Sequence, residues 1–322
     1  MVYKYLKFQI PYSIIRNILI QQKYENIVFH IDLPSISRGF YNKQTVEYEI
    51  TNYIKSKNLP TLFFEEAVEF LGKLHSQFQQ YSPKFSIFLD DGQCKQNKTI
   101  YNGYKDKSSD SHQLLLEDNE LELYHMIKKY YYEEFPKRFK IDNLSRALFL
   151  REYEADFLPW ILYQNNIWNT SNQKTLNVIL STDKDLLQCC QFGNFIQIMT
   201  LYSKRESKII FNVYDDNTAI SQIYSKFQRG ILTSKYIPLI LAISGDKADK
   251  IPGVSGIGPA GAYKFIINYS MPHQINSTTQ LPQELEKYRN LIVRNYKLIS
   301  FEEQLKRVPV SIIDNIKKSY IF

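Results

Sequence analysis

Short runs of β-branched and aromatic residues alternate with longer stretches of helical spacing in the N-terminal part of the chain. The apolar runs that predict buried strands are Ile27–Ile31, Phe85–Leu89, Asn177–Leu180 and Phe195–Leu201. The stretches with helical spacing between them are Leu62–Gln79, Leu114–Tyr132 and Tyr153–Tyr163. Strands that alternate with helices predict an α/β fold, with a mostly parallel central sheet and flanking helices.

The pattern changes after about residue 212, where strand signals fade and helical spacing dominates. The expected helices there are Thr218–Gln228, Ile237–Ile243, Ala260–Tyr269, Leu285–Tyr296 and Ser311–Tyr320. We therefore expect two regions, residues 1–212 with the sheet and residues 213–322 with helices. The segment at about residues 92–140 starts polar and shows no clear strand, so we expect an insertion between sheet elements.

Composition narrows the class of protein. The chain has 322 residues, 44% of them hydrophobic, and is long enough for a large core. No uncharged apolar run approaches the ~18 residues of a membrane span, and the N-terminus is expected to add a helix rather than a signal peptide. Cys94, Cys189 and Cys190 lack metal-ligand spacing. Their odd number and the adjacency of two of them argue against a disulfide framework, which indicates a reducing, cytoplasmic location. The net charge of +7 suits a polyanionic partner.

Three of the predicted strands run directly into acidic residues. Asp32 follows the first strand, Asp90 and Asp91 the second, and Asp183 and Asp185 the third. A single Asp after a strand is more often a helix cap or a turn residue. Because the carboxyl ends of parallel strands meet at one edge of a sheet, three acidic strand ends favour a shared site.

Two further acidic pairs join this set. Glu154 and Asp156 lie near the start of a predicted helix with an apolar body, where the helix dipole alone would also explain them. Asp246 and Asp249 lie near the start of residues 244–265, a stretch that holds five of the 11 glycines. Carboxylates gathered in one cleft need cations, and oxygen ligands without Cys or His favour two or more Mg²⁺ or Mn²⁺ ions. Such ions can support phosphodiester cleavage.

Other phosphate-handling and metal-binding classes find no support in the sequence. A P-loop and a compact calcium-binding loop are both absent from the chain. The start of the insertion interleaves basic and aromatic residues, namely Lys95, Lys98, Tyr101, Tyr104, Lys105 and Lys107. This spacing suits contact with a nucleic-acid strand and is equally consistent with a solvated loop.

These motifs, in this order, resemble those of the structure-specific 5′ nucleases, the family of flap endonucleases, the 5′ nuclease domain of bacterial DNA polymerase I and phage 5′ exonucleases. The similarity runs from about residue 26 to residue 270. It rests on FHIDLPSISRGFYN, FLDDGQCKQNKTIYNGYK, YEAD, STDKDLLQ and GDKADKIPGVSGIG. In the second motif, counting back from Tyr104 and Lys105 favours Asp90 over Asp91 as the ligand.

The resemblance implies a Mg²⁺-dependent 5′-3′ exonuclease or 5′-flap endonuclease whose insertion forms an arch or clamp. The implied metal ligands are Asp32, Asp90, Glu154, Asp156, Asp183, Asp185, Asp246 and Asp249. Lys105 would stabilise the transition state. Residues at about 237–270 would form the family's helix–three-turn–helix motif, which grips duplex DNA and is a candidate K⁺ site. The further implied substrate contacts are Tyr104, Lys98, Gly253, Gly256, Gly258 and Lys264.

The run KYRNLIVRNYKLISFEE at residues 287–303 is similar to the tail of the ribonuclease H of T-even phages. This similarity implies RNA primers in RNA–DNA duplexes as substrates during replication or repair, and the host cytoplasm as the location of a phage-encoded chain. A replicative single-strand-binding protein or a polymerase is the implied protein partner. A PIN-like metal-dependent ribonuclease, which would share the acidic sheet edge, and a non-catalytic duplex-DNA-binding protein stay open as alternatives.

Some positions depart from the family pattern. Phe157 stands where many relatives carry a second Asp after the EAD triplet, which is expected to weaken the second metal site. The usual Arg after the Tyr104-Lys105 pair is missing, and Gln96-Asn97 replace an aromatic–Arg pair. Lys250 stands where Asn is common, and the sequence offers no reason for it.

Overall fold

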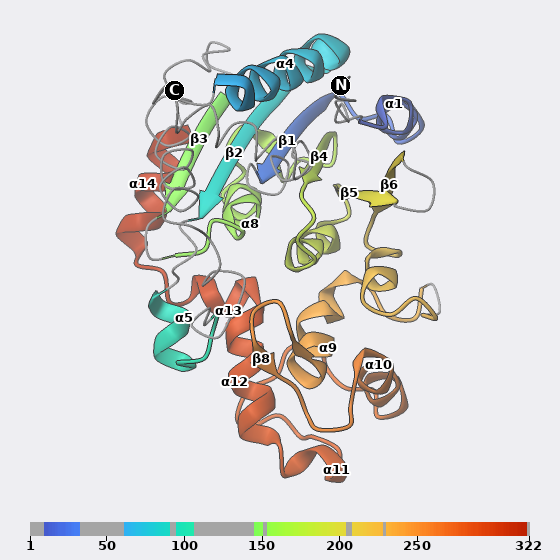
Figure 1. Cartoon of the computed structure of the whole chain (residues 1–322), viewed down its shortest axis with the longest axis vertical. Coiled ribbons are helices and arrows are strands. Elements are labelled where there is room, and N and C mark those ends of the chain that lie inside the picture. Colours follow the sequence, from blue (N-terminus) through green and yellow to red (C-terminus); the bar gives the residue numbers. More distant parts are fainter. Residues whose placement is uncertain are drawn as a thin grey trace, which may run out of the picture.

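A six-stranded sheet forms the centre of the molecule (Figure 1). The computed structural model describes residues 10–32, 61–90, 95–105, 145–150, 153–203, 208–227 and 230–320. In spatial order the strands are β3 (Ser145–Leu150), β2 (Lys84–Asp90), β1 (Asn26–Asp32), β4 (Thr175–Leu180), β5 (Phe195–Ser203) and β6 (Lys208–Tyr214). All neighbouring pairs are parallel except β5 and β6. The predicted α/β fold with a mostly parallel sheet is therefore confirmed.

The four predicted strands correspond to β1, β2, β4 and β5, and β3 and β6 go beyond the prediction. β3 extends the parallel edge beside β2, and β6 turns back against β5 to make the antiparallel edge. The predicted helix Leu114–Tyr132 and most of the insertion at about residues 92–140 lie outside the described residues.

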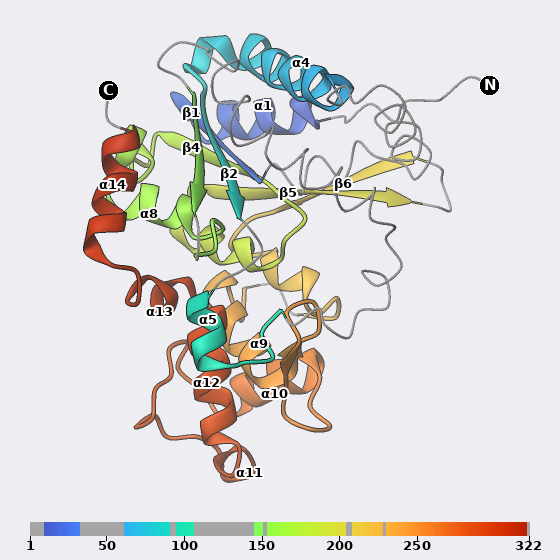
Figure 2. The same ribbon diagram turned by 60° about the vertical axis from the view of Figure 1, so that its left-hand side comes forward.

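Two helices cover one face of the sheet (Figure 2). The expected N-terminal helix is α1 (Tyr12–Gln21), and α4 (Thr61–Phe78) confirms the predicted helix after the first strand. Ile15 and Leu19 of α1 and Phe78 of α4 are fully buried against alternate residues of β1 and β2. This alternation follows from the strand geometry, because successive side chains point to opposite faces.

The C-terminal helices help to cover the other face. Here α8 (Leu158–Gln164) packs with α13 (Phe301–Leu305) and α14 (Val310–Tyr320), and Phe88 of the sheet lies in the same apolar cluster. The Tyr320 hydroxyl group lies 2.7 Å from the buried Ser86 Oγ on β2, and its ring packs edge-on against Trp168. Phe301, Ile316 and Tyr320 thus belong to the apolar core on this face of the sheet. The division into regions at residue 213 stays a prediction.

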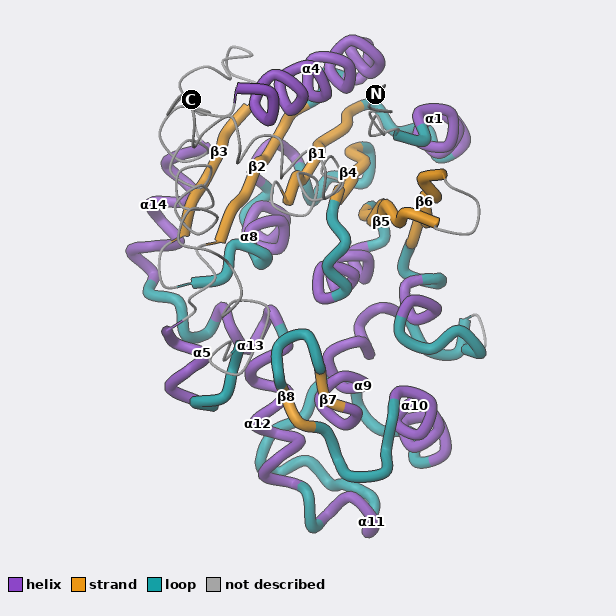
Figure 3. Tube along the Cα trace, in the orientation of Figure 1, coloured by secondary structure: helices purple, strands orange, loops and turns teal. Residues whose placement is uncertain are grey.

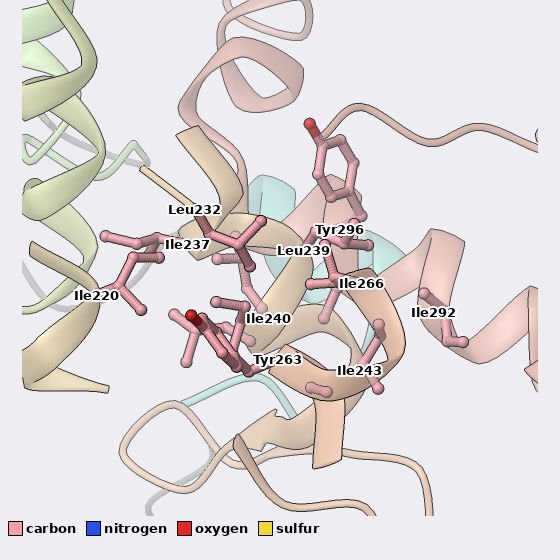
Figure 4. Close-up of a cluster of buried hydrophobic side chains, with 14 of the residues drawn as sticks. Ile220, Leu232, Ile237, Leu239, Ile240, Ile243, Tyr263, Ile266, Ile292 and Tyr296 are labelled. Atoms are coloured by element: carbon pink, nitrogen blue, oxygen red, sulfur yellow. The ribbon is translucent and has the colours of Figure 1, made fainter. Parts of the chain in front are cut away.

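A second apolar core lies beyond the carboxyl ends of the strands (Figure 3). It is built around α9 (Ile237–Ser244), whose residues are buried on almost every side, and α10 (Pro259–Asn268). Tyr263 and Ile266 of α10 and Ile292 and Tyr296 of α12 (Arg289–Ile299) contribute to the same cluster (Figure 4). The predicted helices Ile237–Ile243, Ala260–Tyr269 and Ser311–Tyr320 are confirmed by α9, α10 and α14.

Three predicted helices differ from the structure. The helix expected at Tyr153–Tyr163 begins only at Leu158, because the chain turns through Phe157 and Pro159 suits the first helical turn. Within Thr218–Gln228 only a short 3₁₀ turn forms, η5 (Ala219–Gln222), since the Asp215 carboxylate accepts the Asn217 and Thr218 N–H groups in a local turn. The stretch Leu285–Tyr296 is divided between α11 (Gln283–Glu286) and α12.

The remaining described elements are short. They are η1 (Gln79–Tyr81), α5 (Lys95–Ile100), η3 (Ile167–Asn169), η4 (Asp185–Phe192), η6 (Ser234–Tyr236), β7 (Gly245–Asp246) and β8 (Ile251–Pro252). Among the described residues, no helix is both long and apolar enough to cross a membrane.

The hairpin of β7 and β8 brings two backbone segments into unusually close contact. A Cβ atom at Gly253 would lie 2.2 Å from the carbonyl carbon of Ser244, and one at Gly245 would lie 2.4 Å from the Gly253 nitrogen. Gly245 also has φ +81°, a conformation that other residues rarely adopt. Both glycines are therefore required by the close approach within the hairpin.

Replacing Gly253 with alanine is expected to lower the free energy of unfolding by about 2–4 kcal/mol, because backbone atoms rather than a flexible side chain would have to move. Urea denaturation checks this value. Gly72→Ala is the matched control, since Gly72 lies within α4 and its Cβ would meet nothing within 4 Å. That variant is expected to gain about 0.5–1 kcal/mol, and equal stabilities of the two variants would contradict the close approach.

Candidate active site

Three neighbouring parallel strands deliver acidic residues to one edge of the sheet. Asp32 is the last residue of β1 and Asp90 is the last residue of β2, whose side-chain position lies outside the described part of the structure. Asp183 follows closely after β4, on the other side of β1. The backbone therefore carries these acids to the same edge, as expected from the order of the motifs.

Ser181 links two of these acids, and the sequence motifs alone do not mark it as a site residue. Its hydroxyl group donates to Asp32 Oδ2 at 2.6 Å and accepts the Asp183 N–H at 3.0 Å. The buried Gln197 on β5 donates to the carbonyl groups of Ser181 and Asp183, at 3.1 and 2.6 Å. The loop after β4 is thus fixed by hydrogen bonds before any ion binds. The only signal was its place at the start of the STDKD motif.

Asp185, Asp246 and Asp249 form a compact carboxylate group. Each offers an oxygen, and the three oxygens lie within 4.8 Å of one another. Asp185 begins η4, Asp246 ends β7, and Asp249 lies in the turn between β7 and β8. The group therefore joins the loop after β4 to the hairpin that precedes α10.

The donor set of this group fits a divalent cation. Asp185 Oδ1 is buried and has no hydrogen-bond partner among the described residues, so a carboxyl oxygen is left for a ligand. All three donors are carboxylate oxygens, which suits a hard ion such as Mg²⁺ or Mn²⁺. The residues present therefore fit the metal centre that the sequence predicts.

Glu154 lies beside this group, in contact with Tyr104 and Lys105. The Tyr104 hydroxyl group lies 2.5 Å from Glu154 Oε1 and 3.2 Å from Asp249 Oδ2. Lys105 Nζ lies 2.6 Å from Glu154 Oε1 and 3.8 Å from Asp249 Oδ1. The Lys105 N–H also donates to the Asp249 carbonyl oxygen at 3.0 Å. The segment after α5 is thereby joined to the hairpin by both its backbone and its side chains.

Burial and mutual repulsion oppose ionisation of these acids in the absence of cations. Burial raises the pKa of Asp183, with further contributions from Glu154 and Asp246. Burial and the charge of Asp183 raise the pKa of Asp185 well above its ordinary value. A cluster of this kind gains a stable charged form by binding cations, which is the physical basis for a metal centre here.

Lys184 supplies one internal counter-charge. Its Nζ lies 2.7 Å from Asp246 Oδ1, and the Asp246 side chain is almost fully buried. Burial lowers the pKa of Lys184, but the hydrogen bond and charge of Asp246 outweigh it, so the net shift is upward. Lys184 is therefore held charged beside the carboxylates.

The other residues singled out from the sequence lie around this group. Asp156 is half-buried before α8, near Cys189, whose thiol pKa is raised by burial and then by Cys190 and Asp156. Lys98 on α5 and Lys264 on α10 are exposed. The structure brings together Asp32, Glu154, Asp183, Asp185, Asp246 and Asp249, and the roles of all these residues stay predictions.

Two of the glycines lie in the segment that leads into α10. Gly256 has φ +78°, Gly258 is the residue before the first turn of α10, and a Cβ at either position would meet nothing within 4 Å. The backbone is therefore open to an approaching ligand here, unlike at Gly253, where the hairpin itself excludes a side chain.

Lys250 lies at a constrained position of the backbone. It has φ +57°, in the left-handed region that residues other than Gly, Asn and Asp adopt infrequently. It closes the turn of the hairpin, with its N–H donating to the Lys247 carbonyl oxygen at 3.3 Å. The turn therefore constrains the backbone at this position, and nothing in the turn favours a lysine.

Without divalent ions, stability is expected to fall as the pH rises. Burial raises the pKa of Asp249 from 3.8 to about 7, and Lys105 only partly opposes this. A carboxyl group whose pKa is higher in the folded state than in the unfolded state stabilises the fold fully at pH values below its unfolded-state pKa. That stabilisation is lost as the pH rises through the folded-state pKa. Between about pH 4 and pH 7, the free energy of unfolding of the wild-type protein in chelator should fall by on the order of 2–4 kcal/mol more than that of Asp249→Asn.

Urea denaturation of both proteins in chelator, repeated across this pH range, measures the difference. Identical pH slopes for the wild-type protein and Asp249→Asn would show that the Asp249 carboxyl group is not held in its neutral form by the surrounding structure.

No protein-family model matches the chain. Among curated proteins, DNA polymerase I of Borreliella burgdorferi is 30% identical over 138 residues, which make up 41% of this chain and 13% of that protein. The chain thus matches only a small part of that polymerase.

Two solved structures from bacteriophage T5 have a similar fold over nearly their whole length. The D15 flap endonuclease, in a complex with DNA and metal ions, gives a TM-score of 0.64 at 17% identity, covering 92% of this chain and 98% of the other. The T5 5′-exonuclease with bound zinc gives a TM-score of 0.61 at 16% identity, with the same coverage. The chain therefore has the fold of these phage nucleases, and the resemblance that its motifs indicate is confirmed at the level of the fold.

Proposed function

We propose that this chain is a divalent-metal-dependent nuclease that hydrolyses phosphodiester bonds of DNA near a 5′ end or at a 5′-flap junction. The observation that carries the proposal is the carboxylate group of Asp185, Asp246 and Asp249, with Glu154 and Lys105 beside it. The T5 flap endonuclease, which has the same fold, was crystallised with DNA and metal ions. An acidic cluster beside a fixed lysine suits a reaction in which negative charge develops on phosphate oxygens.

The metal-holding residues in this proposal come from both parts of the chain. Asp32, Asp183 and Asp185 would hold ions from the sheet edge, Glu154 from the turn before α8, and Asp246 and Asp249 from the hairpin. Asp90 and Asp156 complete the set by their place in the motifs. Bound divalent ions would activate the attacking water and stabilise the leaving oxygen. We favour Mg²⁺, or Mn²⁺, on the oxygen-only donor set.

The protein's own contribution is positioning and charge. Lys105 Nζ lies where it can donate to a phosphate oxygen beside the carboxylates, and Tyr104 fixes the Glu154 carboxylate by a hydrogen bond. Ser181 and Gln197 hold the Asp183 loop in place, so the carboxylates do not need to reorganise when substrate arrives.

The grip on duplex DNA is assigned to α9, the β7–β8 hairpin and α10. We propose that these elements form the helix–three-turn–helix motif, with the open backbone at Gly256 and Gly258 facing phosphate and exposed Lys264 adding a contact. A K⁺ ion at this motif is part of the same proposal. Because the chain runs from Asp249 through β8 directly to the start of α10, we propose that the distance from the duplex contact to the cut is fixed.

Cleavage of a labelled 5′-flap duplex, with Mg²⁺ and with chelator, tests the proposal. We expect Mg²⁺-dependent release of the flap or of short 5′ products. DNA binding without cleavage would favour a non-catalytic DNA-binding protein. Cleavage of single-stranded RNA alone would favour a PIN-like ribonuclease.

RNA–DNA duplexes are proposed as additional substrates. The support is the similarity of residues 287–303 to the tail of T-even phage ribonuclease H. Part of that run forms α12, which packs against α9 and carries buried Ile292 and Tyr296. Strong cutting of a DNA flap without release of an annealed RNA primer would reject this part of the proposal.

A further inference from the structure

A polar connection on α12 joins the two segments that meet at the candidate active site. We propose that Arg294 and Asn295 are positioning residues, which hold the β7–β8 hairpin and the Tyr104–Lys105 segment in register. The inference rests on the proposed function for its catalytic consequence, but it also predicts a change in metal affinity that does not depend on cleavage. Neither residue touches the carboxylates in the described structure, so both would act through the backbone that carries them.

Asn295 is fixed to the hairpin. Its side chain is fully buried, and Nδ2 donates to the Ala242 carbonyl oxygen at 3.0 Å and to the Pro252 carbonyl oxygen at 2.7 Å. Ala242 lies in the last turn of α9 and Pro252 lies in β8, so the two carbonyl groups flank the segment with Asp246 and Asp249. One amide nitrogen with two N–H donors satisfies both, which no hydroxyl or carboxylate side chain could do.

Arg294 extends the connection to the segment after α5. Its Nη2 and Nε atoms donate to Asn295 Oδ1 at 2.9 and 3.3 Å. Its guanidinium carbon lies 4.4 Å from the centre of the Tyr101 ring, a stacked cation–π arrangement. A Cβ atom at Gly103 would lie 2.7 Å from the Tyr101 side chain, so the glycine makes room for the ring. The Tyr101 carbonyl oxygen accepts the Tyr104 N–H at 3.0 Å.

The two segments meet again at the site itself. The Lys105 N–H donates to the Asp249 carbonyl oxygen, and the Tyr104 hydroxyl group donates to the Asp249 carboxylate. The hairpin and the Tyr104 segment are therefore joined at the carboxylates and, through Arg294 and Asn295, on the far side. If the contacts of Arg294 and Asn295 were lost, only the hydrogen bonds at the carboxylates would fix the position of the Tyr104–Lys105 segment relative to the hairpin. The hairpin carries Asp246 and Asp249, so its displacement moves these carboxylates relative to Asp185, which weakens metal binding, and relative to Lys105, which weakens catalysis.

The test compares Asn295→Ala and Arg294→Lys with the wild-type full-length chain. Mn²⁺ binding is measured by electron paramagnetic resonance without DNA, and kcat and KM are measured on a 5′-flap duplex. For Asn295→Ala we expect a Kd for Mn²⁺ raised about 10-fold and a kcat lowered about 10–100-fold, with KM changed less than about threefold. Arg294→Lys keeps the charge but loses the planar fork, and should show the same changes at smaller size.

Asn290→Ala is the matched control, because Asn290 is the same residue type on the same helix and is exposed. It should leave Kd and kcat unchanged. The proposal would be overturned if folded Asn295→Ala had a Kd for Mn²⁺ and a kcat within twofold of the wild-type values. It would also be overturned if the variant had a lower unfolding midpoint without any change in Kd. If Asn295→Ala does not fold, Arg294→Ala decides by the same criteria. Mn²⁺ binding without cleavage by the wild-type chain would reject the proposed function, while the Kd comparison still tests the positioning role.

Discussion

Asp183→Asn should lower the rate of phosphodiester cleavage by at least about 10³-fold and leave DNA affinity within about threefold. Asp183 is half-buried beside Asp185, Glu154 and Asp246, so its charge contributes to the centre where the metal ions would bind. An asparagine keeps the oxygen that accepts the Asp185 N–H, a bond of 2.9 Å in the structure, and so the loop should keep its shape. The loss is therefore expected in the chemical step and not in the fold.

The same variant should be more stable than the wild-type protein in chelator, by about 1 kcal/mol, because it removes one of several repelling buried charges. Single-turnover cleavage, anisotropy with labelled DNA and urea denaturation measure the three quantities. Asp314→Asn, at a half-exposed position of α14, controls for the loss of one negative charge. Cleavage by Asp183→Asn at the wild-type rate would show that the site lies elsewhere.

Lys105→Ala is expected to lower kcat by about 10²–10³-fold, as for the loss of one charged donor to a developing oxyanion. Mn²⁺ affinity should change in the opposite direction. Lys105 Nζ lies 2.6 Å from Glu154 and 3.8 Å from Asp249, so in the metal-free protein it occupies positions that an ion would compete for. Removing it is expected to tighten Mn²⁺ binding about three- to tenfold.

This pair of opposite effects separates a catalytic role from damage to the fold, which would weaken both quantities. Lys297→Ala on α12 is the control, because Lys297 is exposed and its loss removes the same charge. If Lys105→Ala kept the wild-type kcat, the lysine would be a counter-charge to Glu154 and nothing more.

The strand ends could be predicted from the sequence because burial on both faces gives a mostly apolar run, interrupted by His30 in β1 and by Asn177 in β4. β3 could not be predicted from the sequence, because SRALFL contains good helix formers. Its extended form depends on hydrogen bonds to β2, which a local pattern does not reveal. The run IIFNVY is typical of a strand and forms most of β6, but it crosses the boundary predicted at residue 212, and no strand was predicted there.

The candidate site shows the same division. The carboxyl ends of parallel strands meet at one edge of a sheet, so the places of Asp32 and Asp183 could be predicted from the sequence. The roles of Ser181 and Asn295 could not, because they arise only where distant segments meet. Ser181 and Asp32, for example, are 149 residues apart in the chain. A serine or an asparagine is common in loops and helices, and nothing in its neighbours along the chain distinguishes the buried one.

The packing of α13 and α14 against the sheet has a consequence for synthesis. The strands that carry Asp32 and Asp183 are complete by residue 185, but Phe301, Ile316 and Tyr320 cover part of their apolar face. A growing chain would therefore leave part of that face uncovered until residues 301–320 have been synthesised, and an uncovered apolar face favours aggregation.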